Sequence, residues 1–396
     1  MAILKLLNVK LIKRMKKLIL KISAYKLVFI SVVFLIFFSV GCAKKGEKEI
    51  KIGAILPLTG DAAVWGNNTK KGIDLAVEEI GKKGGVNGKK IKIIYEDSQG
   101  LPQKGVSAIQ KLITVDKVPV VIDDSMSSVT LAMAPIAEKN KVVILSTGAT
   151  APKISEAGEY IFRIWNSDDL EGKVSAKFIY EDLRLSNAII LYINNDYGKG
   201  LEDVFKREFQ ILGGKILLSN NFDQGDSDFK TQLAKIKDLR PEIIYLIGYP
   251  KEISIILKQA SELNVGSKII GTVTFEDPHI IQLAGKAAEG AIYPYPIEPN
   301  KEDLVVNEFL NKYKMKYNEV PGITADVGYD AVNMIALAIK LHGGEKGEDI
   351  QKGLVMIKDF HGASGLMTFD KNGDVQKPIR MKTVRNGEFM WLKNKE

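Results

Sequence analysis

Hydrophobic residues recur in two alternating patterns along most of the chain. Short, nearly continuous apolar runs, such as residues 50–56, are typical of strands buried on both faces. Between these runs, apolar residues return at every third or fourth position, as in Ile73, Ala76 and Ile80, which places them on one face of a helix. Strands that alternate with helices predict parallel sheets covered by helices on both faces.

The alternation occurs twice. The first set of predicted strands covers residues 50–56, 91–95, 118–122 and 142–145, with later helices at 103–115 and 125–140. After an extended segment at 160–165 and a helix at 169–183, the second set of strands covers 188–193, 215–218, 243–248 and 269–273. Two sets of similar size predict an α/β fold with two doubly wound, Rossmann-like lobes.

The C-terminal part of the chain departs from this alternation. Residues 291–300 hold three prolines, which stiffen an extended crossing between lobes. Helices are predicted near 301–318, 325–341 and 347–359, followed by strands up to Leu392. The pair Asn372-Gly373 lies between strand-like segments and predicts a hairpin turn there.

The first 41 residues have the character of a targeting segment. A basic stretch is followed by an uncharged run at 27–40, then by Gly41 and Cys42. This order is typical of a secretory signal, and the run is shorter than the about 20 residues that span a bilayer. A single transmembrane anchor is the second interpretation. Residues 39–42 (SVGC) resemble the bacterial lipobox, which implies that the peptide 1–41 is removed and that Cys42 is acylated. Residues 42–49 are predicted to be a flexible tether.

The net charge of +8 comes from this N-terminal segment. Residues 1–41 hold eight of the 56 Lys and Arg and none of the 48 Asp and Glu, so the rest of the chain is formally neutral. A nucleic-acid partner is therefore not expected, because binding phosphates needs a surplus of cations.

Cysteine and histidine usage argues against metal and redox sites. Cys42 is the single cysteine, so an intrachain disulfide and a thiolate metal cluster are excluded. The three histidines are far apart and not in a metal-binding spacing. The sequence also lacks a GxGxxG after a strand and a GxxxxGK[ST], so neither a metal nor a nucleotide cofactor is expected.

Three polar segments follow strands of the first set, at 60–66 (with Trp65), 123–128 and 146–150. Ligands of open α/β sheets bind at the carboxyl ends of strands. Ser and Thr at strand-to-helix turns often only cap the helix. Together with free backbone N–H groups they also form a site for a carboxylate, and both interpretations stay open on these residues alone.

Several segments, in order, resemble the periplasmic leucine/isoleucine/valine-binding protein family. They are IKIGAILPLTGDAAVWG at 50–66, GATAPKI at 148–154, DYGKG at 196–200, LAGKAAEG at 283–290 and GYDAV at 328–332. These proteins are type I receptors of ABC importers. The resemblance implies three hinge crossings near 164–168, 293–297 and 362–365. Lobe 1 would comprise 50–166 and 297–362, and lobe 2 would comprise 167–296 and 363–396.

The resemblance also implies a function and site residues. The chain would be a monomeric, extracytoplasmic receptor and not an enzyme. It would bind a branched-chain or other hydrophobic amino acid, pass it to an ABC permease and ATPase, and be held at the membrane by its lipid anchor. The ligand carboxylate would meet the hydroxyl and amide of Ser127. The carbonyl of Ala149 and the hydroxyl and amide of Thr150 would contact the ligand's polar end, and the ligand side chain would meet Trp65, Tyr197 and Tyr249.

One position departs from the family. The family usually has an acid for the ligand ammonium shortly after a glycine that ends a second-lobe strand, and here that position is Val273. A buried ammonium without a countercharge costs several kcal/mol, about 3–5 for a broken buried pair. Three explanations stay open. Glu276 or Asp277 takes the role through a shifted loop, Asp124 or Asp168 takes it over, or the ligand is a small carboxylate or amide without an amine. A carboxylate at Asp124, in a turn that is usually neutral in the family, favours a cationic group on the ligand.

Two other classes of function are open to this fold. A ligand sensor or chemoreceptor partner would use the same architecture. An extracytoplasmic hydrolase would need a nucleophile with a base, and the sequence has neither a GxSxG nor a histidine near Ser127 or Thr150.

Overall fold

The computed structural model describes residues 13–18, 49–123, 126–300 and 302–392. Residues 13–18 are helical and belong to a unit (1–48) distinct from the large unit that begins at Glu49. The predicted tether up to Lys48, Cys42 and Asp124 lie outside the described residues. Among the helices that are described, none has the length and apolar character needed to cross a membrane.

The first lobe is built on a five-stranded parallel sheet. Its order is β2-β1-β3-β4-β5, and its strands are β1 (Glu49–Leu56), β2 (Lys90–Asp97), β3 (Val120–Asp123), β4 (Val143–Ser146) and β5 (Ile161–Arg163). Side chains alternate between the two faces of a strand, and both faces are covered here. Val143 and Leu145 belong to one hydrophobic cluster, while Ile144 between them belongs to another. This double burial explains why the strands are nearly continuous apolar runs.

Helices from both halves of the sequence cover this sheet. The cluster on one face includes residues of α2 (Ala63–Lys82), α11 (Ala325–His342) and α12 (Gly347–Met356). The cluster on the other face includes residues of α3 (Pro102–Lys111) and α4 (Ser127–Asn140). Helix α10 (Leu304–Tyr317) also returns to this lobe and packs beside α2. The first lobe is therefore completed by helices that follow most of the second lobe in the sequence.

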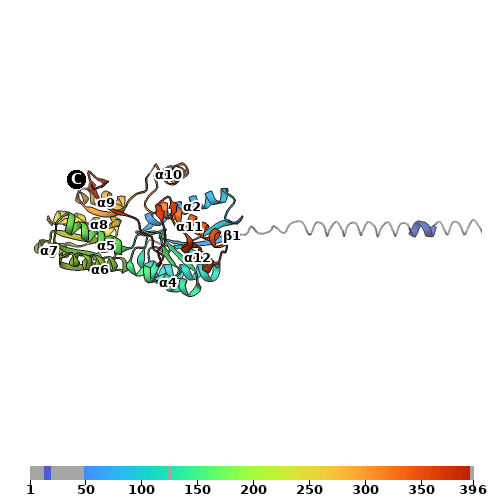
Figure 1. Ribbon diagram of the computed structural model, residues 1–396, viewed down its shortest axis with the longest axis horizontal. Helices are drawn as coiled ribbons and strands as arrows, with labels where there is room; N and C mark the ends of the chain where they lie inside the picture. The colour runs from blue at the N-terminus through green and yellow to red at the C-terminus, as the bar shows by residue number, and fades with distance from the viewer. Residues whose placement is uncertain (1–12, 19–48, 124–125, 301, 393–396) are drawn as a thin grey trace, which may run out of the picture. The chain divides into compact units, whose positions relative to one another are not determined.

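The second lobe has a seven-stranded sheet in the order β14-β13-β10-β9-β8-β6-β7. Its parallel strands are β6 (Asn187–Ile193), β7 (Lys215–Phe222), β8 (Ile243–Ile247), β9 (Lys268–Ile270) and β10 (Ile292–Pro296). Its helices are α5 (Asp168–Lys177), α6 (Asp196–Ile211), α7 (Lys230–Leu239), α8 (Pro250–Glu262) and α9 (Pro278–Ala284). Figure 1 shows α5–α9 gathered around this sheet, apart from α2, α4, α11 and α12.

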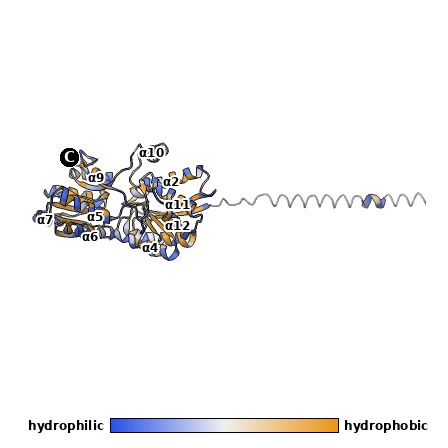
Figure 2. Cartoon of the chain, in the orientation of Figure 1, coloured by the Kyte–Doolittle hydropathy of each residue, from blue (hydrophilic) through white to orange (hydrophobic). Residues whose placement is uncertain are grey.

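The parallel strands of the second lobe repeat the order of the first. Read in sequence, β6 to β10 take the places that β1 to β5 take in the other sheet. In both lobes the hydrophobic residues concentrate on the strands and the inner faces of the helices (Figure 2). The predicted fold class, two doubly wound α/β lobes joined by three crossings, is confirmed.

The third crossing lies later in the chain than predicted. We expected it near 362–365, but β11 (Phe360–Gly362) and β12 (Gly365–Met367) form a small hairpin, and Met367, Phe369 and Val375 are buried in the first lobe's core. The chain enters the second sheet only at β13 (Ile379–Arg385). Residues 363–375, assigned to lobe 2 from the sequence, therefore pack with lobe 1.

The predicted hairpin at Asn372-Gly373 is also displaced. Those residues do form a tight turn, closed by the Asp370 amide donating to the Asp374 carbonyl at 2.8 Å, but no strand pair flanks it. The ladder forms instead between β13 and β14 (Glu388–Trp391). Its turn is Asn386-Gly387, with φ of 54° and 72°, and this second Asn-Gly pair has the positive φ values of a tight hairpin turn.

The first and third crossings are tied to one another. The Asn166 side-chain amide donates to the Lys377 carbonyl at 2.9 Å, and the Lys377 backbone N–H donates to Asn166 Oδ1 at 2.6 Å. Both residues are buried. One side chain thus imitates a β-bridge between two segments that are far apart in sequence.

Two glycines of α2 differ in how closely they approach helix α11. A Cβ at Gly72 would lie 1.8 Å from the Ala325 carbonyl oxygen, whereas a Cβ at Gly81 would meet nothing within 4 Å. We expect Gly72→Ala to lower the free energy of unfolding by about 1–3 kcal/mol or more, because two backbones must separate. Gly81→Ala in the same helix should raise it by up to about 1 kcal/mol. Urea unfolding of both variants measures this, and equal behaviour would contradict the close helix contact.

Candidate functional site

A cleft lies where the carboxyl ends of the two sheets meet. In each lobe the strand order reverses between the first and third strands, and ligands bind at such switch points. The segments that follow β1, β3, β6 and β8 carry Trp65, Ser127, Tyr197 and Tyr249, respectively. All four line one cleft, whose empty space is about 560 Å³ with its open mouth included. The other lining residues are Gly148, Thr150, Trp165, Val273, Thr274, Ile323 and Thr324.

The polar end of the cleft is the start of α4. Ser127 is the first residue of this helix, so unpaired backbone N–H groups of its first turn give the end a partial positive charge. Ser127 Oγ accepts hydrogen bonds from the amides of Thr150 and Ala151, both at 3.1 Å. Since a serine hydroxyl has two acceptor sites and one proton, its proton is left to donate to a ligand oxygen. Ala149 is buried beside this point, outside the lining, with its amide donating to Ser146 Oγ at 3.2 Å.

Thr150 has the opposite hydrogen-bonding character. Its hydroxyl donates its single proton to Asp168 Oδ2 at 3.0 Å. It is therefore left as an acceptor towards the cleft. The Thr150 amide, which the resemblance assigned to the ligand, is already engaged by Ser127. A donor at Ser127 and an acceptor at Thr150 lie side by side, which suits a ligand end that carries both an anion and a donor.

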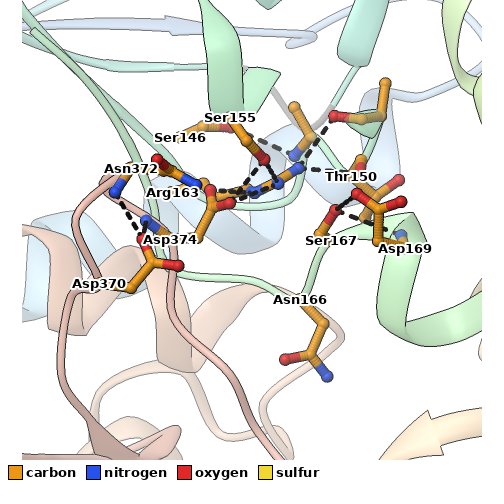
Figure 3. Close-up of polar contacts among 12 residues, drawn as sticks. Ser146, Thr150, Ser155, Arg163, Asn166, Ser167, Asp169, Asp370, Asn372 and Asp374 are labelled. Atoms are coloured by element: carbon orange, nitrogen blue, oxygen red, sulfur yellow. Dashed lines mark hydrogen bonds and ion pairs between the residues drawn. The ribbon is translucent and has the colours of Figure 1, made fainter. Parts of the chain in front are cut away.

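One buried guanidinium holds this polar end in place (Figure 3). Arg163 donates from Nη1 to the carbonyls of Thr150 and Ala151, at 2.9 and 3.0 Å. It pairs with Asp374 through Nε and Nη2, at 2.6 and 2.9 Å, and with Ser155 through Nη2 at 2.6 Å. The Arg163 side chain is fully buried and all its donor nitrogens are used. The turn at 148–151 is therefore fixed to the segment that leads into the third crossing.

Aromatic side chains form the walls. Trp65 meets Tyr249 edge-on at 6.1 Å between ring centroids, and Tyr249 stacks on Tyr197 at 5.8 Å. The Tyr197 hydroxyl donates to Thr272 Oγ1 at 2.8 Å, so its ring is held rigidly. Trp165, in the first crossing, packs edge-on against Tyr295 at 6.2 Å. Aromatic walls of this kind suit an apolar ligand body.

The two lobes touch around the cleft. Trp65 Nε1 donates to Asp277 Oδ2 at 2.7 Å, and the Asp196 amide donates to Ser128 Oγ at 3.2 Å. On the exposed rim, Lys251 pairs with Asp61 at 3.0 Å. These contacts join lobe 1 to lobe 2 and partly enclose the cleft.

The side chain at the position where the resemblance implied an acid is apolar. Val273 lines the cleft. Glu276 is engaged by the Tyr293 hydroxyl at 2.6 Å and by Lys382 at 2.5 Å. Asp277 accepts from Trp65 and from the His279 amide at the start of α9. Both acids that a shifted loop would bring in therefore have protein partners.

A second acid, not identified from the sequence, lies directly behind this wall. Glu171, one turn after Asp168 on α5, accepts a hydrogen bond from the Val273 amide at 3.1 Å. Burial raises the pKa of Asp168 to about 7, with Arg163 opposing that effect. Burial and the nearby Asp168 raise the pKa of Glu171 well above its usual value. Each carboxyl group is thus hydrogen-bonded to a residue that lines the cleft: Asp168 to Thr150 and Glu171 to Val273.

Other lining residues were missing from the sequence-based set, namely Gly148, Trp165, Thr274, Ile323 and Thr324. Trp165 lies in the first predicted crossing, so an aromatic residue at a hinge was a usable signal. Thr324 carried no such signal. Its backbone has φ of 73°, which is rare and strained for a β-branched residue. Its hydroxyl donates to the Trp65 carbonyl at 3.0 Å, which ties the α11 start to the tryptophan of the wall.

Within the described ranges, no group of three or more His, Cys, Asp or Glu is placed to hold a metal ion. His279 is paired with Asp277 at 2.8 Å. The arrangement can hold a small molecule with a polar end and an apolar body, in a cleft that lobe separation would open.

Comparison with known proteins agrees with this geometry. The family model described as periplasmic binding protein matches residues 49–388. The chain belongs to the periplasmic binding protein family. This is a family of extracytoplasmic solute-binding receptors.

Similar members of this family span most of the chain. A "Leucine-, isoleucine-, valine-, threonine-, and alanine-binding protein" of Pseudomonas aeruginosa is 30% identical, with 83% of this chain and 87% of that protein covered. The leucine binding protein LivK of Thermotoga maritima is 31% identical with a TM-score of 0.82, covering 87% of this chain and 98% of that one. LivJ of Streptococcus pneumoniae, solved in complex with isoleucine, is 29% identical with a TM-score of 0.79, covering 86% and 98%.

Removing the Arg163 guanidinium should destabilise the folded chain. Arg163→Met leaves Asp374 buried without its cation and removes one hydrogen bond from each of the Thr150 and Ala151 carbonyls, so we expect the free energy of unfolding to fall by about 3–5 kcal/mol. A matched control is Arg207→Met, which breaks an exposed pair with Asp169 at 3.7 Å and should cost about 0–1 kcal/mol. Chemical denaturation measures both. A small, equal loss in the two variants would show that Arg163 does not organise the site.

Proposed function

We propose that this chain is the solute receptor of an ABC importer, and that it binds a small ligand of the branched-chain or hydrophobic amino acid class between its two lobes. The observation that carries the proposal is the single cleft that combines a helix start at Ser127 with aromatic walls from both lobes. The names of the similar proteins, which include leucine and isoleucine binding, support the same class of ligand.

The cleft favours binding without chemistry. Its polar groups are a helix start and neutral hydroxyls, which bind a carboxylate by oriented dipoles. Its walls are fixed by hydrogen bonds on their outer sides, as at Trp65 and Tyr197. A ligand held by both lobes would stabilise the closed arrangement and so mark the receptor as loaded for a permease and ATPase.

A receptor for a small carboxylate or amide without an amine is the second candidate. The observation that favours it is Val273, an apolar residue where an ammonium would otherwise meet an acid. The same aromatic walls would accept the apolar body of either ligand, so the two candidates differ at the amine alone.

We also propose that the receptor is anchored to the outer face of the cell membrane through Cys42, as a monomer. The lipobox-like residues 39–42 and the basic and apolar segments before them support this proposal. Two acyl chains on one cysteine would anchor the protein stably, whereas a single chain binds only marginally.

The anchor has a direct test. In the producing cells, Cys42→Ser should leave the chain uncut by lipoprotein signal peptidase and without lipid label, because the thiol is the acylated group. Metabolic labelling with a fatty acid and the mass of the mature chain measure both steps. Normal acylation of the variant would refute the assignment.

Ligand contact at the polar end predicts a loss of affinity. Ser127→Ala or Thr150→Ala should weaken leucine binding by about 1–3 kcal/mol, since each leaves a buried polar group unpaired. Ser107→Ala is the control, because its hydroxyl lies on the exposed face of α3. Calorimetric titration gives the affinities. Unchanged affinity in both site variants would reject this placement of the ligand.

A further inference from the structure

Two buried carboxylates stand at the start of α5 without a cation of their own. Asp168 is fully buried, and while its Oδ2 accepts from Thr150, its Oδ1 has no hydrogen-bond partner among the described residues. Glu171 is 4% exposed, and its Oε1 accepts from the Val273 amide. The two acids lie three residues apart, on neighbouring positions of one helix face.

The charges around this pair do not balance. Arg163 lowers the pKa of Asp168 through its charge, but its guanidinium is directly paired with Asp374. One cation is therefore shared by Asp374 and Asp168, while the charge that acts on Glu171 is the negative charge of Asp168. A buried carboxylate without a countercharge is stabilised either by taking up a proton or by binding a cation. The unbalanced pair adjoins the cleft through Thr150 and Val273, which both line it.

We propose that Asp168 and Glu171 together supply the negative charge for a ligand ammonium, in place of the acid that is missing at Val273, and that binding of the amine expels a proton from this pair. The proposal deepens the proposed function and rests on it. Glu171 is assigned as a specificity-determining residue that selects amines over carboxylates of the same shape.

The hydrogen bonds explain how the charge reaches the ligand. When Asp168 is ionised, the Thr150 hydroxyl must donate to it and can only accept from the ligand. An ammonium satisfies that acceptor, and a carboxylate does not. The Ser127 hydroxyl, which accepts two amide hydrogen bonds, offers its proton to the ligand carboxylate instead. The polar end thus distinguishes the two ends of an amino acid.

The groups around Asp168 and Glu171 do not themselves release a proton, so the proton that is expelled on binding comes from these two acids. Asp168 faces Arg163 from β5 and Asp169 from its own helix, and Glu171 faces Tyr197 from α6 and Tyr245 from β8. Burial raises the pKa of both tyrosines well above the usual value, so they stay protonated. An arriving ammonium lowers the pKa of the acids. Fewer protons are bound in the complex than in the free protein, so affinity for an amine should rise with pH.

The wild-type chain allows the first test. Leucine and isocaproate, its analogue without the amine, are titrated calorimetrically at pH values below, at and above 7, in buffers of different ionisation enthalpy. We expect leucine affinity to rise by up to about tenfold per pH unit below the Asp168 pKa of about 7 and to level off above it, with proton release to the buffer. Isocaproate should bind at least about tenfold more weakly, with flat or falling affinity as pH rises.

Substitutions then locate the charge. Glu171→Gln should weaken leucine by about tenfold or more and flatten its pH dependence, while isocaproate changes by less than about threefold. Glu202→Gln is the matched control, since Glu202 is a buried glutamate of the same lobe that accepts from Ser219 at 2.7 Å, away from the cleft. It should leave both ligands unchanged. Adding Val273→Glu to Glu171→Gln should restore leucine binding.

The outcomes separate the two proposals. The inference is overturned, with the receptor function intact, if wild type prefers isocaproate or if Glu171→Gln keeps both the affinity for leucine and its pH dependence. If folded wild type binds neither probe, both proposals fail. The wild-type pH series decides the matter even where a variant does not fold.

Discussion

A single buried cation organises the polar half of this molecule. Arg163 lies in the last strand of the first sheet and uses every donor it has, on two backbone carbonyls, one hydroxyl and one carboxylate. A buried guanidinium is tolerated only where its hydrogen bonds and its charge are matched. The hydrogen bonds and the ion pair of Arg163 hold the turn around Thr150 and the segment around Asp374 together. The polar end of the cleft is therefore hydrogen-bonded directly to a buried side chain of the first sheet.

The two lobes contribute different chemistry through the same topology. Each has its strand order reversed at the same place, so each presents two loops to the cleft. The first lobe offers the α4 start and Thr150, and the second offers the stacked rings of Tyr197 and Tyr249. The helix start and Thr150 come from one lobe and the aromatic walls from both, so neither lobe alone completes the cleft. A ligand that contacts both lobes would therefore favour the closed arrangement.

Much of the fold and of the site follows from the sequence, because both rest on local rules. Strand periodicity located both sheets, and the strand-end rule pointed to Trp65 and Ser127. The third crossing did not follow, since the apolar residues after Gly362 fit either core. Two Asn-Gly pairs predict turns equally well, and only the partner strands decide which one closes a hairpin.

The role proposed for Glu171 could not be predicted from the sequence, for a similar reason. An acid in the first turn of a helix is what any solvated helix start has. Its contact with the Val273 amide joins two segments about a hundred residues apart, and only the folded chain brings them together. The same holds for Thr324, whose unusual φ no residue pattern announces.

The bridge between Asn166 and Lys377 has a mechanical consequence. Because the first and third crossings are joined by two hydrogen bonds, we expect them to move together. Such a link should restrict twisting of one lobe against the other more than it restricts hinge opening. The degree of lobe opening would then change along one direction. A partner protein that contacts both lobes could therefore distinguish a closed, ligand-bound receptor from an open one.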